Sequence, residues 1–593
     1  MKKHFITTIL LSMLCEAVFA SKAWNQPLSF LQPDGTYVTV ILHGDEYGNW
    51  YTSTDGKLLA RKGNYFYVAE TSQNGSLIPS DIVAHNSNQR TPSETKAYLN
   101  QNYSSFSKRQ SMLRSIVKRE AISASGYVPH SGKIKVAVIL ADFSDIKFSL
   151  PDPKKSFNQF FNGVGAPQNF GNYENRNVAS VSQYFADQSN GAFTPTFDVY
   201  GPVHLPHSES YYGGNNSYGQ DSNYRDVITD AVQLMRDSIN LNTYDNMGTG
   251  QADLVYVIFA GYGENYGAPD STLWAKSFPY AQNNIRYAGI SSELLGISTS
   301  FKTPHISGIG LFCHEFSHTL GLPDFYSTVN TDSIYDNQGM EDWSLMDNGE
   351  NVYNGWCPTA YTPWEREAMG WATIDSLQTA GQVKLTNIDE GGKAYRIVNP
   401  NNNKEYWIVQ YVQNKGWNKY LGGNNPADDT MKVNGLLLYH VDYDSYRFSL
   451  SGNTVNTEIG HPRMTVVPAD GLLMSSYRMD GTNTYQDQIA GDIFTSGDSI
   501  TANQSLINYL PWTGTYSLPI YNINTKNDAL YFDFLNKTAT TGINLNLSEL
   551  KSQSIYYSLD GKLIKHPSKG QLVIEKTNNE LKFPTCHFTG FRE

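Results

Sequence analysis

One short stretch, running from His314 to Asp324 with the sequence HEFSHTLGLPD, constrains this chain more than any other. On a helix, His314 and His318 lie four residues apart on one face, so both rings can point at one metal ion. Glu315 lies beside the first histidine, where a carboxylate can deprotonate a water held at that metal. Gly321 permits a sharp turn out of the helix, which would bring Asp324 back as a third ligand. The stretch therefore predicts a helix carrying a catalytic zinc site with one position open to water.

The same residues also fit a simpler interpretation, an ordinary buried helix whose two histidines are satisfied by neighbours. Apolar residues are available for that packing, at Leu311, Phe312, Phe316 and Leu320. The positions of Gly321 and Asp324 are those of a metzincin-type zinc site, and they favour zinc. Both interpretations can share the helix, since its apolar residues can anchor it while the histidines face a cleft. Asp324 could bind the metal directly or form a hydrogen bond to a side chain that binds it.

A second informative stretch follows at Trp343–Asp347, with the sequence WSLMD. A methionine in a tight turn beneath the metal is the Met-turn of metzincins. A lone methionine is more often core filler, but Met346 follows Asp324 closely and stands in a Ser-x-Met context. We therefore expect Met346 to support the histidine rings by packing rather than to bind zinc.

With 593 residues the chain is too long for one core. Residues 1–20 have the layout of a signal peptide, with a basic start, an apolar stretch and a small-residue cleavage site at Val18-Phe19-Ala20. Cys15 would suit a lipoprotein, but Leu14 stands where a small residue is required. No later segment is apolar enough to span a membrane, so we expect a protein that is secreted or held at a bacterial cell surface.

Residues 21–125 read as a separate unit, with strands predicted at residues 37–42 and 65–68. A polar run from Ser93 ends in basic residues up to Arg119. It could be a solvated helix face or linker, or a processing site that frees a catalytic domain.

Residues 126–375 alternate buried strands, at 134–140 and 253–261, with helices, at 180–187 and 224–239, before a metal helix from about Ile306. The region 262–303 contains the edge strand on which we expect an extended substrate to pair. Residues 376–540 form short strands typical of a β-sandwich, and residues 541–593 form a small strand-rich tail.

The two motifs carry a family resemblance. His314–Tyr326 and Trp343–Met346 resemble the immune inhibitor A family of secreted bacterial zinc metalloproteases, with weaker similarity at Ser182–Phe185 and Gly435–Asp442. The resemblance covers roughly residues 120–500. It implies an α+β fold with a metzincin-like catalytic domain (a twisted sheet plus an active-site helix), an N-terminal prodomain at 21–125 and β-rich extensions behind it. Asp324 matches the aspartate of this family, where most metzincins carry histidine. The tail resembles C-terminal sorting modules, and its alternative is a hairpin without a role.

Several side chains have two interpretations. Cys313 and Cys357 could form a bridge below the site or remain two buried thiols. Calcium could bind aspartates of the C-terminal region, but no EF-hand spacing is present and solvated loop carboxylates fit as well: Asp442, Asp444, Asp470, Asp487 and Asp492. Tyr353 and Tyr361 are candidates for stabilising an oxyanion, although neither has the usual Met-turn offset.

The function predicted from these residues is zinc-dependent hydrolysis of peptide bonds, in which Glu315 takes a proton from water and passes it to the leaving amine. The expected partners are protein or peptide substrates, and the formal charge of -12 argues against nucleic acid. We expect a monomer. An adhesin or glycan-binding protein with a vestigial site is the alternative, although such a site has no chemical need for Glu315. A carboxylate-pair glycosidase is a second alternative, but no compact acidic pair supports it.

Overall fold

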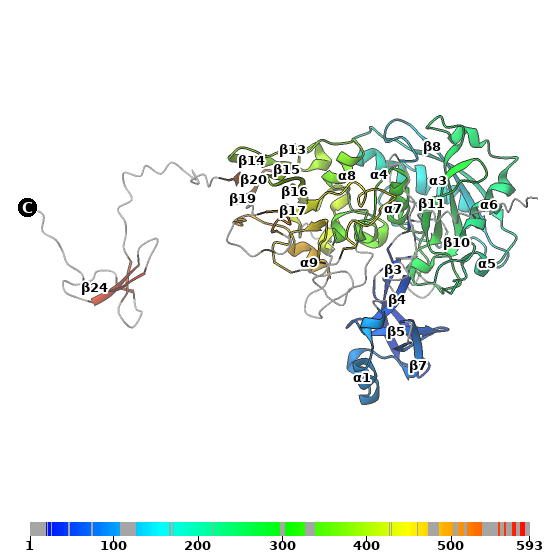
Figure 1. Cartoon of the computed structure of the whole chain (residues 1–593), viewed down its shortest axis with the longest axis horizontal. Coiled ribbons are helices and arrows are strands. Elements are labelled where there is room, and N and C mark those ends of the chain that lie inside the picture. Colours follow the sequence, from blue (N-terminus) through cyan, green and yellow to red (C-terminus); the bar gives the residue numbers. More distant parts are fainter. Residues whose placement is uncertain are drawn as a thin grey trace, which may run out of the picture. The chain divides into compact units, whose positions relative to one another are not determined.

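The computed structural model describes most of the chain (Figure 1). The described residues are 19–20, 22–24, 26–45, 48–72, 75–106, 109, 126–164, 168–169, 171–217, 219–296, 303–326, 339–425, 427, 430–458, 460–472, 485–501, 506, 509–514, 519–535, 555–557, 563–564, 572–576 and 581–586. The chain divides into two units, Met1–Lys537 and Thr538–Glu593.

A six-stranded sheet lies at the centre of the first unit. Its order is β1-β11-β12-β10-β8-β9, and the strands are β1 (Phe19–Ala20), β8 (Lys135–Asp142), β9 (Thr196–His204), β10 (Ala252–Tyr262), β11 (Lys276–Pro279) and β12 (Ile285–Leu294). Strands β12, β10, β8 and β9 run parallel, whereas β11 is antiparallel to β12 and to β1. The near-continuous apolar runs at 134–140 and 253–261 follow from this position, because parallel strands are buried on both faces.

Helices cover both faces of this sheet. Alternate residues of β8 enter different cores: Val136 and Val138 pack in the cluster that contains Phe312, whereas Ala137 and Ile139 pack in the cluster that contains Val227. The first cluster includes residues of α3 (Pro153–Asn162), α4 (Val181–Gln188) and α7 (Ile309–Thr319). The second includes residues of α5 (Glu209–Gly213) and α6 (Tyr224–Met235). Short 3-10 helices η2 (Leu241–Tyr244) and η3 (Glu264–Tyr266) flank β10.

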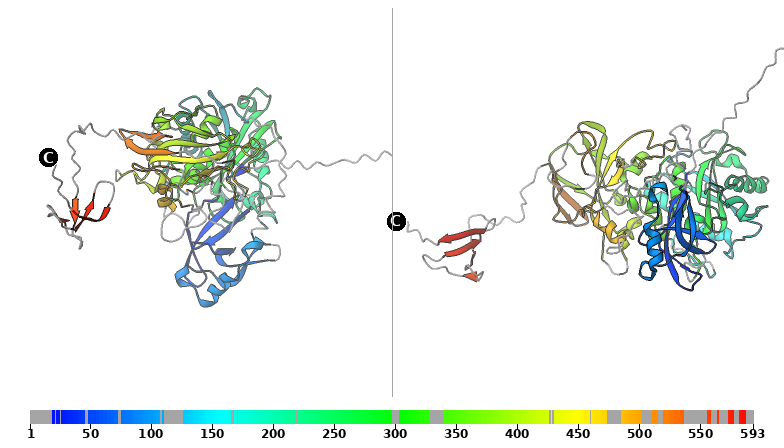
Figure 2. Two further views of the ribbon diagram at one scale, coloured as in Figure 1. Left: turned by 60° about the vertical axis from the view of Figure 1, so that its left-hand side comes forward. Right: turned by 60° about the horizontal axis from the view of Figure 1, so that its bottom comes forward.

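The N-terminal region forms a meander of six antiparallel strands, coloured blue in Figure 2. Its strands are β2 (Leu28–Leu31), β3 (Tyr37–Asp45), β4 (Gly48–Ser53), β5 (Leu58–Lys62), β6 (Tyr65–Thr71) and β7 (Leu77–Val83), followed by η1 (Ser87–Gln89) and α1 (Pro92–Leu99). The predicted strands at 37–42 and 65–68 fall in β3 and β6. The core of this meander includes Trp274, Leu311 and Trp356, so the region packs on α7 and on the segments next to β11 and η5.

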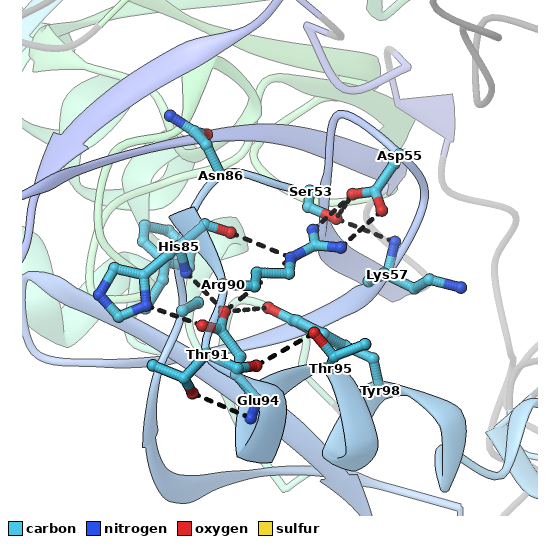
Figure 3. A network of polar contacts seen from close by, with 12 residues as sticks. Ser53, Asp55, Lys57, His85, Asn86, Arg90, Thr91, Glu94, Thr95 and Tyr98 are labelled. Atoms are coloured by element: carbon cyan, nitrogen blue, oxygen red, sulfur yellow. Dashed lines mark hydrogen bonds and ion pairs between the residues drawn. The ribbon is translucent and has the colours of Figure 1, made fainter. Parts of the chain in front are cut away.

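A polar network attaches α1 to the meander (Figure 3). His85 contacts Glu94 through Nδ1 at 2.8 Å and Asp34 through Nε2 at 2.7 Å. Arg90 donates to both carboxylate oxygens of Asp55, at 2.6 and 2.5 Å. Thr91 caps the helix by accepting from the Glu94 backbone N–H. The polar run that begins at Ser93 is therefore a helix over its first residues, and of its basic end only Arg109 is described.

Two sheets follow the central one. Their orders are β13-β15-β16-β17-β18 and β14-β20-β19, and the strands are β13 (Asp375–Ser376), β14 (Gly381–Leu385), β15 (Tyr395–Asn399), β16 (Asn402–Gln413), β17 (Asn434–Asp442), β18 (Met464–Val466), β19 (Ile520–Lys526) and β20 (Ala529–Phe534). Trp407, Leu436 and Phe532 belong to one apolar cluster that joins the two sheets. We call residues 376–535 the C-terminal sheet region.

The remaining helices are α8 (Pro363–Ala368), α9 (Tyr485–Gly491), η4 (Glu341–Trp343), η5 (Asn348–Gly355), η6 (Ile388–Glu390), η7 (Gly416–Asn418) and η8 (Leu421–Gly423). The cluster below α7 continues into the C-terminal sheet region, since Met346 and Trp364 share it with Leu437, Phe448 and Met464. The central sheet and this region are therefore joined by a continuous core.

The second unit holds β21 (Ile555–Tyr557), β22 (Leu563–Ile564), β23 (Leu572–Lys576) and β24 (Leu581–Cys586), in the antiparallel order β22-β21-β23-β24. The expected strand-rich tail is present.

Three sequence expectations change or lie outside this description. The metal helix begins at Ile309 rather than near Ile306, because Ile306 bridges to Leu294 at the edge of the sheet. Cys313 and Cys357 are both buried free thiols, so they do not form a bridge. Residues 1–18, most of the predicted signal peptide, lie outside the described residues. In the part of the chain that is described, no helix is long and apolar enough to cross a bilayer.

Candidate metal centre

Two glycines let α7 approach the segment behind it closely. A Cβ on Gly308 would lie 2.5 Å from the backbone of Gly355, and one on Gly310 would lie 2.0 Å from the Glu350 carbonyl. Larger side chains at these positions would push the helix away from η5. All residues of α7 are buried, so the helix presents its polar side chains to an interior site rather than to an open surface.

The structure brings His314, His318 and Asp324 together, as the sequence predicted. Asp324 Oδ1 lies 3.2 Å from His314 Nε2 and 3.4 Å from His318 Nε2. Among the described residues, these three side chains form the one group of three metal-binding residue types whose ligand atoms all lie within 4.8 Å of one another. Gly321, at φ +100°, makes the turn that returns the chain to the histidines, a conformation that L side chains rarely adopt.

Each histidine is held by its other nitrogen. His314 Nδ1 donates to the Leu345 carbonyl at 2.9 Å, and His318 Nδ1 donates to the Leu322 carbonyl at 2.8 Å. A carbonyl only accepts, so these contacts place the proton on Nδ1 and leave the lone pair on Nε2. Backbone carbonyls in this position are the usual partners of metal-binding histidines. Both Nε2 atoms face Asp324 Oδ1, so the residues present fit a zinc ion.

The segment predicted as a Met-turn is tied by hydrogen bonds to His314 and to the residue after Asp324. Met346 is fully buried, and its carbonyl accepts from the Phe325 N–H at 2.7 Å. Its own N–H donates to Ser344 Oγ at 3.0 Å. Because the Leu345 carbonyl also accepts from His314, this segment fixes the His314 ring and the residue after Asp324 together.

Acidic groups set the electrostatics of the site. Burial raises the pKa of Glu315 to about 8, and neither of its carboxylate oxygens has a hydrogen-bond partner among the described residues. Burial likewise raises the pKa of Glu350 to about 8; this carboxylate lies 3.9 Å from His314 Nδ1. Burial opposes ionisation of Asp324 too, but His318 and His314 outweigh it and hold the pKa of Asp324 well below its usual range. Asp324 is therefore the acid that carries a negative charge at neutral pH, and that charge faces both histidines, which suits a cation.

The N-terminal residues reach this site. Phe19 and Ala20 pair with Ser277 and Lys276 of β11, and the Ser277 hydroxyl donates to the Glu315 carbonyl at 3.1 Å. Lys22 is 2% exposed, and its ammonium lies 3.0 Å from Asp347 and 3.8 Å from Glu341. Asp347, the residue after Met346, thus anchors the start of the N-terminal region.

The two tyrosines proposed as oxyanion donors are engaged elsewhere. The Tyr361 hydroxyl bonds to Ser317, and its ring packs against Tyr184. Tyr353 stacks on Tyr420 with ring centroids 3.7 Å apart, at the wall of a cavity of about 910 Å³. Of the five aspartates considered for calcium, four have other partners: Asp442 pairs with Arg463, Asp492 accepts from Trp343, and Asp444 and Asp470 accept backbone N–H groups. The side chain of Asp487 lies outside the described residues.

Three residues near the metal-binding side chains could not be identified from the sequence, because none of them belongs to a motif. Lys22 stands in a polar stretch, Glu350 has no motif around it, and Asn453 lies 129 residues beyond the aspartate that it contacts. The Asn453 side chain accepts from the Asp324 N–H at 2.6 Å and donates to Asp324 Oδ2 at 2.6 Å.

Comparison with known proteins identifies the same part of the chain. Residues 127–371 match the family model described as immune inhibitor A peptidase M6, catalytic domain. Immune inhibitor A of Bacillus thuringiensis subsp. alesti is 25% identical over 285 residues, which cover 41% of this chain and 41% of that protein. Pre-pro-metalloprotease PrtV of Vibrio cholerae serotype O1 is 26% identical over 218 residues, covering 32% of this chain and 23% of PrtV. The matches thus span less than half of each relative. The resemblance to the immune inhibitor A family is confirmed, and residues 127–371 are the part of the chain that is similar to its peptidase domain.

Proposed function

We propose that this protein is a secreted zinc metalloendopeptidase that hydrolyses peptide bonds of extracellular proteins. The observation that carries the proposal is the convergence of His314, His318 and Asp324 within 4.8 Å, with Glu315 buried on the same helix. The match to a peptidase family and the relative named as a metalloprotease support the reaction class.

Zinc bound by these three side chains would polarise the scissile carbonyl and lower the pKa of a coordinated water. Glu315 accepts the proton of the attacking water and returns it to the leaving amine. Its oxygens have no hydrogen-bond partner among the described residues, so both can take part. The Leu345 and Leu322 carbonyls keep the histidine rings in one tautomer and orientation throughout.

The proposal includes synthesis as a zymogen. The outer edge of β11, where we expect an extended substrate to pair, is taken by Phe19 and Ala20. Lys22 is fixed beside the Met-turn by Asp347, and Trp24 donates its N–H to the Asn265 carbonyl at 2.9 Å. Substrate and the N-terminal residues would compete for the same edge. Cleavage of a signal peptide after Ala20 would remove β1 and leave the contacts of Lys22 and Trp24 to maintain the blocked state.

The domain plan belongs to this proposal. We infer a prodomain at 21–125, a metzincin-like catalytic domain at 126–375, a β-sandwich at 376–540 and a tail at 541–593. The support is that the meander, the strands of the central sheet other than β1, the two C-terminal sheets except for Asp375 of β13, and the four-stranded tail sheet fall in these intervals. Asp324 is then a zinc ligand and Met346 the Met-turn residue.

Hydrolysis of casein or gelatin by the trypsin-processed protein tests the function. We expect activity that is lost on adding a zinc chelator and that is absent from Glu315→Ala, whereas zinc content is retained in Glu315→Ala. Stoichiometric zinc without cleavage of any protein substrate would reject the peptidase and favour the binding-protein alternative.

A further inference from the structure

We propose that Asn453, in the C-terminal sheet region, positions the metal ligand Asp324, so that a part of the chain beyond the matched peptidase segment completes the metal centre. This inference rests on the proposed zinc site. It concerns a residue that lies outside residues 127–371.

Asn453 forms hydrogen bonds to both the backbone and the side chain of Asp324. Its Oδ1 accepts from the Asp324 N–H and its Nδ2 donates to Asp324 Oδ2, each at 2.6 Å. Asn453 is 2% exposed, so water does not compete for these bonds. A side chain with one donor and one acceptor is required to make both contacts, and an asparagine amide supplies them.

The second contact determines which oxygen of Asp324 faces the histidines. With Oδ2 held by the amide, Oδ1 is the atom directed at His314 Nε2 and His318 Nε2. Without the amide, Oδ2 would be a buried charged acceptor with no donor, which is costly. The carboxylate would then rotate to seek another donor, and the ligand geometry would loosen.

The backbone at Asn453 is built for this role. Its φ is +41°, in the left-handed region where asparagine is tolerated and most residues are not. The Asn453 N–H donates to the Ser449 carbonyl at 2.7 Å, which fixes the turn that carries it.

A second asparagine, Asn456, forms a hydrogen bond to the residue that follows Asp324. Asn456 Nδ2 donates to the Phe325 carbonyl at 2.7 Å and to the Met464 carbonyl at 2.8 Å. The Phe325 ring also packs against Phe448, with centroids 6.3 Å apart. Residues 324 and 325 are therefore attached to the C-terminal sheet region by side-chain, backbone and apolar contacts.

The test replaces Asn453 by glycine in the full-length protein. Glycine accepts the positive φ, so Asn453→Gly removes the amide without backbone strain. Asn453→Asp keeps the shape but sets a carboxylate against that of Asp324. The matched control is Asn522→Gly: Asn522 also has a positive φ, at 55°, and its Nδ2 also donates to an aspartate, Asp533, at 2.5 Å, but in β19, away from the three ligands.

Zinc affinity is measured by competition with a chromogenic chelator, and the absorption spectrum of the cobalt-substituted protein reports ligand geometry. We expect zinc affinity to fall about 10- to 100-fold in Asn453→Gly, to fall further in Asn453→Asp, and to stay at the wild-type value in Asn522→Gly. The cobalt spectrum should change in the two Asn453 variants alone.

Wild-type zinc affinity and an unchanged cobalt spectrum in Asn453→Gly would overturn the inference, as would an equal loss of affinity in Asn522→Gly. Absence of stoichiometric zinc from the wild-type protein would instead reject the proposed function. If Asn453→Gly does not fold, the comparison rests on Asn453→Asp, since aspartate also tolerates the left-handed backbone; a zinc affinity equal to that of the wild type in that variant would again overturn the inference.

Discussion

Replacing Lys22 by methionine should activate the unprocessed protein. The Lys22 ammonium is buried against Asp347 at 3.0 Å and Glu341 at 3.8 Å. Removing one partner of a buried ion pair costs about 3–5 kcal/mol. Asp347 keeps backbone N–H donors from Met340, Glu341 and Asn348, so the loss should fall near the lower limit, about 3 kcal/mol. Since about 1.4 kcal/mol is a factor of ten, the population with the N-terminal residues released should rise roughly 100-fold.

The assay is hydrolysis of a quenched fluorescent casein by protein that has not been treated with trypsin. Activity of the processed wild type gives the ceiling, and Lys96→Met, which changes an exposed lysine on α1, is the matched control. A Lys22→Met/Glu315→Ala double variant excludes a contaminating protease. Equal latency of Lys22→Met and Lys96→Met would refute the reasoning, because the buried ammonium would then contribute nothing to the blocked state.

Three further predictions concern the metal and the meander. Glu315→Gln should lower the turnover of the processed protein by at least about 100-fold while zinc content stays stoichiometric, since proton transfer contributes roughly 10²–10⁴; simultaneous loss of zinc would assign Glu315 a structural role. Zinc at 100 times its Kd should stabilise the metal-free protein by about 2.7 kcal/mol, and an unchanged melting temperature would contradict a site formed in the folded state. Burial lowers the pKa of His85, but Asp34 and Glu94 outweigh it and raise that pKa above its usual value. The contacts of protonated His85 with Asp34 and Glu94 therefore stabilise the fold below pH 6.5, and this stabilisation is lost as pH rises through the raised pKa. The difference in melting temperature between wild type and His85→Gln should shrink between pH 6 and pH 9. A difference that stays constant over this range would contradict the prediction.

The convergence of His314, His318 and Asp324 could be predicted from the sequence because it depends on local geometry. Two histidines four residues apart on a helix share a face wherever that helix is placed, and Gly321 turns the chain back within a few residues. That Met346 lies against the residue after Asp324 was predictable for a similar reason, since the two are close along the chain. The partners that orient these groups are backbone carbonyls, as at Leu345 and Leu322. Every residue has a carbonyl, so residue types carry no information about which ones are used.

Strands and helices of the central sheet were also predictable, because apolar runs and helical spacing are local patterns. The pairing of strands was not. Residues 19–20 were read as the end of a signal peptide, and the same two residues pair with β11. An alanine and a phenylalanine suit a cleavage site and an edge strand equally well. Only the ion pair of Lys22 with Asp347 shows that this part of the chain lies against the central fold.

Asn453 shows where sequence reasoning stops and what the fold adds. In the sequence it is one asparagine in a Ser-Gly-Asn-Thr stretch, which reads as an ordinary turn. In the folded chain this turn has two roles. It reverses the backbone in a left-handed conformation that suits asparagine, and it directs the amide of Asn453 at Asp324. The cluster of apolar residues that runs from Met346 through Phe325 and Phe448 holds the turn in place. A segment ending at residue 371 would lose both the amide and about a third of the buried residues of this core, Phe448 among them. In the proposed site, two regions of the chain therefore hold Asp324, and the contacts of Asn453 extend beyond the boundary of the peptidase match.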